Sequence, residues 1–161
     1  MGIECTDYNV DYAGYGGDDS IRFCKVTAPA TETINSLSMN AQTATGNVKL
    51  AVYTNQSPAG LDQPDELIGY TNSTAVVAGL HSYAMTAGHE LTSGTDYWVG
   101  FILSEVAGAK KESNAGSNVM AYYSHTYADS FPSTLSGPSF STTGLQVCID
   151  TSGTPVPPPR S

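Results

Sequence analysis

The fold is decided by the stretch of residues 47–54, which reads NVKLAVYT. Its apolar members Val48, Leu50 and Val52 occupy every second position, and a period of two is that of a β-strand with one face in the core. The intervening positions, which include Tyr53, therefore belong to the other face. This stretch predicts a β-strand whose apolar face packs in the core.

Seven more strand-like runs flank this stretch, separated by Gly, Pro, Asn and Ser. They cover residues 21–27, 34–40, 67–72, 81–86, 97–103, 119–124 and 145–150. No window carries an apolar stripe with a period of 3.6 residues, and residues 104–113 are read as a loop. About eight short strands at this spacing predict an all-β antiparallel β-sandwich of the jelly-roll type.

The two ends of the chain differ from this pattern. Residues 1–20 are rich in Tyr, Asp and Gly, and predict an irregular segment that wraps the sandwich. Residues 153–161 hold four prolines, which favour an extended polyproline conformation typical of inter-domain linkers. We therefore expect one domain over residues 1–152, followed by a Pro-rich linker to a neighbouring domain.

Charge narrows the choice of partners. Only 13% of the 161 residues are charged, and 15 acidic residues against 6 basic ones give a net charge of −9. Such a balance repels phosphate backbones, so we expect no nucleic-acid partner. No run of 18 apolar residues occurs, so we expect no membrane span either.

The chain has three cysteines, Cys5, Cys24 and Cys148, so at most one internal disulfide can form. Sandwich folds often bring the first and last strands together, which favours a Cys5–Cys148 bridge. A Cys24–Cys148 bridge and three buried thiols are the alternatives.

Three stretches carry a resemblance to known proteins: GNVKLAVYTN, ELIGYTNSTAVVAG and ELTSGTDYWVGF. Together they resemble the secreted bacterial β-sandwich accessory domains found beside glycoside hydrolases and adhesins, which are like carbohydrate-binding modules. The resemblance spans residues 34–123 and is most specific over 91–101. It implies a secreted or cell-surface sandwich module, and it says more about architecture than about ligand.

One candidate binding surface is an aromatic sheet face. Alternation places Trp98 on the same side of its strand as the small residue Gly100, and a flat ring beside a hollow suits stacking of a sugar ring. If Trp98 shares a face with Tyr53, then Tyr122 or Tyr123 can complete the platform. The alternative is that Trp98 fills the core.

A second candidate is the aromatic segment 122–131, where Tyr127 and Phe131 lie among Ser, His and Asp residues. Aromatic rings beside polar groups combine stacking with hydrogen bonds to hydroxyl groups. Tyr12 and Tyr15 of the N-terminal segment would join this site. The alternative is that these rings pin a long loop onto the sandwich.

Acidic residues also suggest a structural calcium ion, which takes six to eight oxygen ligands. The candidate ligands are Asp7, Asp11, Asp18, Asp19 and Asp150. Their spacing is not that of an EF-hand, and jelly-roll sugar-binding modules commonly carry such an ion. The alternative is a set of solvated acids.

The sequence offers little for catalysis. It contains no GxSxG or HExxH motif and no acidic pair set in apolar runs. We therefore predict a non-catalytic carbohydrate-binding module that attaches a larger secreted enzyme or adhesin to a polysaccharide. The alternative is a structural or adhesive sandwich that contacts other proteins.

Overall fold

The chain folds into stacked antiparallel sheets. The computed structural model describes residues 3–5, 10–12, 19–56, 63–112, 119–135 and 137–150, with the backbone alone for 3–5, 10–12, 110–112 and 150. These residues form strands and turns without a helix, and so contain no helix that could cross a membrane. The predicted all-β antiparallel sandwich is confirmed.

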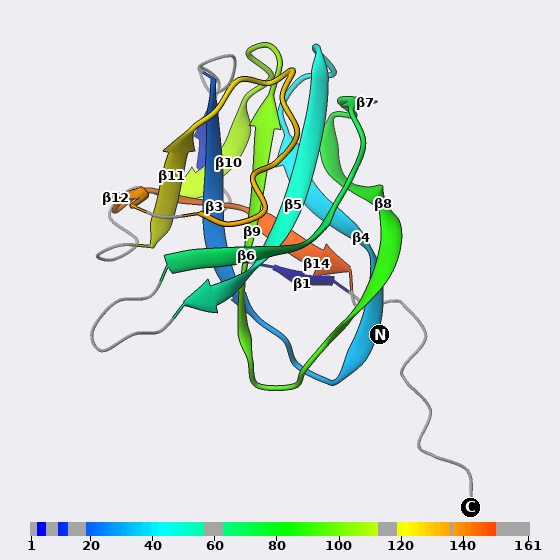
Figure 1. Ribbon diagram of the computed structural model, residues 1–161. Coiled ribbons are helices and arrows are strands. Elements are labelled where there is room, and N and C mark those ends of the chain that lie inside the picture. The colour runs from blue at the N-terminus through cyan, green and yellow to red at the C-terminus, as the bar shows by residue number, and fades with distance from the viewer. Residues whose placement is uncertain are drawn as a thin grey trace, which may run out of the picture.

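Two sheets form the layers (Figure 1), and Figure 1 shows β14 passing behind the larger one. The larger, here called the front sheet, has the order β12 (Ser139–Ser141), β11 (Met120–Ser124), β3 (Ser20–Thr27), β9 (Asp96–Leu103), β5 (Asn47–Gln56) and β6 (Gln63–Tyr70), with β7 (Thr74–Ala75) paired to β5. The back sheet has the order β1 (Ile3–Cys5), β14 (Val147–Asp150), β4 (Glu32–Ala41) and β8 (Gly79–Leu91). A small third sheet joins β13 (Gly144–Leu145), β10 (Ala109–Glu112) and β2 (Val10–Tyr12).

Each of the eight predicted runs overlaps a strand. Along the chain, the long strands pass several times from one sheet to the other. The chain crosses between the sheets from β3 to β4, from β4 to β5 and from β8 to β9. Two expectations are wrong in part. Residues 3–5 and 10–12 are strands within the supposed irregular N-terminal segment, and β10 lies in the supposed loop 104–113. These short strands are held by partners distant in the sequence, which a local pattern does not reveal.

The space between the sheets holds the interlayer core. The predicted inward face of β5 is confirmed, because Val48, Leu50 and Val52 are fully buried there. From the opposite layer, Leu37 and Met39 of β4 pack into the same cluster. Burial of these side chains is the main source of stability for a sandwich of this size.

The other side of the front sheet is also covered. Residues 125–135, here called the covering segment, follow β11 and appear in Figure 1 as the gold strand-free stretch that crosses in front of β9. Backbone hydrogen bonds fasten it to β6, from the Leu67 amide to the Ser133 carbonyl (2.9 Å) and from the Leu135 amide to the Asp65 carbonyl (2.8 Å). The apolar cluster formed between this segment and the sheet is here called the outer core, and its buried members are Ile21, Phe23, Ala51, Tyr53, Trp98, Ile102, Ala121, Phe131 and Leu135.

The cysteines divide into a disulfide and a free thiol. Cys148 is disulfide-bonded, and Cys24 is a free, buried thiol. The register of β1 on β14 sets the backbone of Cys5 directly opposite Cys148. Because the two backbone positions face each other, the structure favours the Cys5–Cys148 pairing among the sequence alternatives.

The Cys24 thiol is expected to be unreactive. Burial raises its pKa to about 12, although a hydrogen bond from the Leu145 amide to Sγ (3.2 Å) works in the opposite direction. At neutral pH the group is therefore a neutral thiol, and the thiolate is the nucleophilic form.

Thiol counting with Ellman's reagent tests both assignments. The folded protein should show no reactive thiol, because Cys24 is buried and protonated. Unfolding in denaturant should expose one thiol, since the three cysteines less the two in the bridge leave one. Reduction should then expose three. Peptide mapping without reductant should link Cys5 to Cys148, and a peptide linking Cys24 would contradict the assignment.

Candidate functional site

The predicted Trp98 platform is placed correctly on the sheet but is not exposed. Tyr53 of β5 pairs directly with Trp98 of β9, so the two rings share the outer face of the front sheet as expected. Their exposed fractions are 0% and 1%. The expectation that they form an open stacking surface is wrong, because the covering segment lies over this face.

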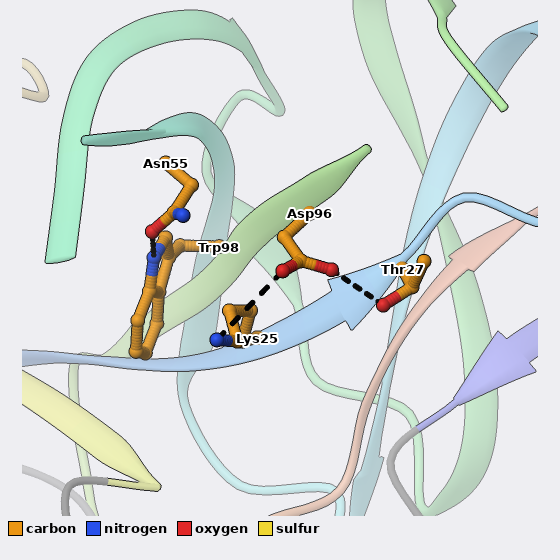
Figure 2. Close-up of polar contacts among 5 residues, drawn as sticks. All are labelled: Lys25, Thr27, Asn55, Asp96 and Trp98. Carbon is orange, nitrogen blue, oxygen red and sulfur yellow. Dashed lines mark hydrogen bonds and ion pairs between the residues drawn. The ribbon is translucent and has the colours of Figure 1, made fainter. Parts of the chain in front are cut away.

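Hydrogen bonds show how this burial is satisfied. The Tyr53 hydroxyl donates to the Pro132 carbonyl of the covering segment (2.5 Å). Trp98 Nε1 donates to Asn55 Oδ1 at 2.7 Å, as Figure 2 shows. Buried Trp and Tyr side chains usually find a polar partner of this kind, so both rings behave as core residues.

Beside Trp98 the outer face turns polar. Lys25 Nζ lies 6.0 Å from the centre of the Trp98 ring and 3.8 Å from Asp96 Oδ2. The Thr27 hydroxyl donates to the other oxygen of that carboxylate, Oδ1, at 2.5 Å (Figure 2). This polar strip closes the edge of the outer core instead of opening it to a ligand.

The hollow beside Trp98 is filled as well. The ring of Phe23 on β3 lies against Gly100 and packs edge-on to Tyr53, with ring centres 5.2 Å apart and planes at 86°. Phe23 itself is fully buried. The predicted recess for a sugar is therefore occupied by the protein's own side chain.

The remaining aromatic candidates do not form one surface. Tyr122 packs against the interlayer core, where the Arg22 guanidinium lies 5.6 Å from its ring centre, whereas Tyr123 packs against the outer core. Tyr12 is described by its backbone alone, paired with Ala109. Tyr15 lies outside the described residues.

The calcium ligands are largely beyond the described part of the chain. Asp7 and Asp18 lie outside it, and Asp11 and Asp150 are described by backbone alone. Asp19 is exposed and adopts a φ of 50° at the start of β3. Within the described residues, no group of three His, Cys, Asp or Glu side chains is placed to hold a metal ion. The calcium site stays a prediction.

Phe131 lines a cavity, and Tyr127 hydrogen-bonds to one of its lining residues. A pocket of about 260 Å³ opens between β5, the end of β6 and the covering segment. The lining residues are Lys49, Leu67, Tyr70, Thr71, Asn72, Ser73, Ala128, Ser130 and Phe131. Tyr127 borders it through its hydroxyl, which shares a 2.6 Å hydrogen bond with the Ser73 hydroxyl.

Lys49 ties the covering segment to this pocket. Its ammonium donates to the carbonyl oxygens of Tyr127 and Asp129, the latter at 2.8 Å. Nζ also lies 4.7 Å from the centre of the Tyr127 ring and 5.6 Å from that of Phe131. These contacts are hydrogen bonds and cation–π interactions, which stabilise a partly desolvated cation.

The pocket wall combines an exposed ring with polar groups. Tyr70 is 41% exposed, and its ring centre lies 6.5 Å from that of Phe131, with planes at 51°. The side chains of Asn72 and Ser130 are exposed, and within the described residues neither has a hydrogen-bond partner. A pocket with apolar rings and a few unpaired polar groups is the usual form of a small-ligand site.

The sequence pattern missed most of this pocket. Tyr127 and Phe131 were candidates, but Lys49, Tyr70 and Asn72 were not. One available indication was Lys49 itself, a cation in the middle of an apolar strand and on the same face as Tyr53. Such a residue needs partners, and those partners lie about eighty residues later in the chain.

The packing of Phe23 generates a stability prediction. A Cβ at Gly100 would lie 2.3 Å from Phe23 Cδ1, and the Phe23 ring is fully buried in the outer core. We expect Gly100→Ala to lower the free energy of unfolding by about 1–3 kcal/mol in urea titrations. Gly69→Ala in β6 is the control, because its Cβ would meet the ends of the half-buried Met85 and His89 side chains. An equal or larger loss at Gly69 would contradict this account of the outer core.

Comparisons with known proteins supply no identity for the chain. No protein-family model matches it, and no curated protein matches it.

Proposed function

We propose that the protein is a non-catalytic carbohydrate-binding module, and that its pocket holds one sugar residue of a polysaccharide. The observation that carries this proposal is the pocket wall, where the exposed Tyr70 ring stands beside the side chains of Asn72 and Ser130, which have no hydrogen-bond partner among the described residues. In the parent protein the module would attach a larger secreted enzyme or adhesin to its polysaccharide.

The chemistry of a sugar matches this wall. A pyranose presents apolar C–H groups on its face and hydroxyl groups around its rim. Tyr70 offers a ring for the face, while Asn72 and Ser130 offer donors and acceptors for the rim. One such site gives only modest affinity, of order micromolar to millimolar, because few contacts offset the ordering of a flexible glycan.

The lining also favours binding over hydrolysis. Glycoside hydrolysis uses two carboxylates placed on either side of the scissile bond. The described residues that line the pocket include no Asp or Glu. A structural calcium ion in the acidic N-terminal segment and a secreted location belong to the same proposal, as features of such modules.

The alternative function is a structural or adhesive module. Val77 and Leu80, at one end of the sandwich, have exposed fractions of 41% and 46%, and such groups could contact another protein. Under this alternative the chain would self-associate in gel filtration and would bind no glycan.

Affinity electrophoresis against soluble glucans, xylans, mannans and polyuronates tests the proposal. At least one of them should retard the protein, and Tyr70→Ala should weaken that binding about tenfold or more, because the stacking ring is lost. The melting temperature should change little, since Tyr70 is well exposed.

Leu80→Ala is the matched control, because Leu80 is similarly exposed but lies on β8 of the back sheet. This variant should bind as the parent does. The protein should come from a bacterial host, since Asn72-Ser73-Thr74 is an N-glycosylation triplet and Asn72 lines the pocket. Equal losses in both variants would rule out the pocket as the site.

A further inference from the structure

We infer that the pocket selects a sugar that carries a carboxylate, such as a uronic acid, and that Lys49 Nζ is the group that recognises it. The inference rests on the proposed glycan site and specifies its ligand class. Three features support it: the neutral character of the hydrogen-bond partners of Lys49, a third donor that the described residues do not accept, and Lys49 as the one charged residue among the described lining residues.

The partners of Lys49 are dipoles and ring faces, not charges. Nζ donates to two carbonyl oxygens and lies over two aromatic rings. Within the described residues, no carboxylate lies within ion-pair distance of it. The charge is partly desolvated, and this burial lowers the pKa of Lys49, while the Asp129 carboxylate nearby raises it. A partly buried cation that forms no ion pair with the described residues can still attract an anionic ligand.

Lys49 also has hydrogen-bonding capacity left. An ammonium group has three N–H donors, and the described residues accept two of them. Lys49 lines the pocket, so a ligand bound there would lie beside this ammonium group. A carboxylate there would complete the donor set with a charge-assisted hydrogen bond, which is about twice as strong as a neutral one.

The described lining residues include no carboxylate; Asp129, between Ala128 and Ser130 in the chain, is outside the lining but close enough to act on Lys49. Lys49 is the one charged residue among the described lining residues, so the lining is cationic in a chain with a net charge of −9. Asp129 and His125 belong to the covering segment, and the ring of His125 stacks on Phe131 with planes at 4°. This local reversal of charge distinguishes the pocket from the chain as a whole.

Titration calorimetry with short oligosaccharides tests the inference directly. The probes are di- and trisaccharides of galacturonate, glucuronate, mannuronate and guluronate, each compared with its methyl ester and with the neutral sugar of the same configuration. Short ligands at about 0.15 M salt avoid general repulsion between a polyanion and an acidic protein, because charges are screened beyond roughly 8 Å. At least one uronate should bind about tenfold more tightly than its ester, the effect of one charge-assisted hydrogen bond.

Variants then assign the preference to Lys49. Lys49→Gln should reduce the ratio of acid to ester affinity to about one, and Lys49→Arg should retain much of it. Lys25→Gln is the matched control, because Lys25 lies on the same sheet face but outside the pocket lining, and it should leave the ratio unchanged. Reading a ratio separates charge recognition from any loosening of the covering segment, which would weaken both ligands together.

The outcomes separate the two proposals. Binding of neutral sugars without preference for any uronate would overturn the inference and leave the glycan site standing. A preference that survives Lys49→Gln would overturn the assignment to Lys49. If no acidic or neutral glycan binds, the proposed function fails and the inference fails with it.

Discussion

Strand β9 is apolar on both faces, so each face has to be shielded from water by another part of the chain. The architecture follows from this requirement. Every residue from Tyr97 to Leu103 is buried. The back sheet covers one face, as in any sandwich of two packed layers. The second face bears Trp98 and Ile102, and it is sealed by the covering segment, which adds a third layer without regular secondary structure.

The pocket is a by-product of that second cover. The covering segment is irregular, so its side chains do not fill all the space above the pleated sheet. Hydrogen bonds from the Tyr53 hydroxyl and the Lys49 ammonium hold this segment to the sheet. Beside β6, where the rings of Phe131 and Tyr70 meet at 51°, the cover leaves a cavity that both rings line. The same lysine therefore holds the cover in place and supplies the charge at the cavity wall.

Much of the fold could be predicted from the sequence, because alternation is a local property. The period of two in β5 correctly assigned Val48 to the interior and Tyr53 to the opposite face. It could not show whether that opposite face meets solvent, because the residues that cover it, such as Phe131, come much later in the chain. Burial of Trp98 and the pairing of Lys49 with distant carbonyl groups depend on tertiary contacts, so the candidate site could be only partly anticipated. Tyr127 and Phe131 were found from local aromatic density.

The pairing of β3 with β9 has a consequence for how the chain folds. Arg22 of β3 is opposite Phe101 of β9, and β11 pairs with the other edge of β3. These neighbouring strands of the front sheet are therefore far apart in the sequence. Chains dominated by such non-local contacts fold slowly, because loop entropy is lost before the contacts form. The covering segment can settle only on a completed sheet, so we expect it to form last and to be the first part to open in the native state.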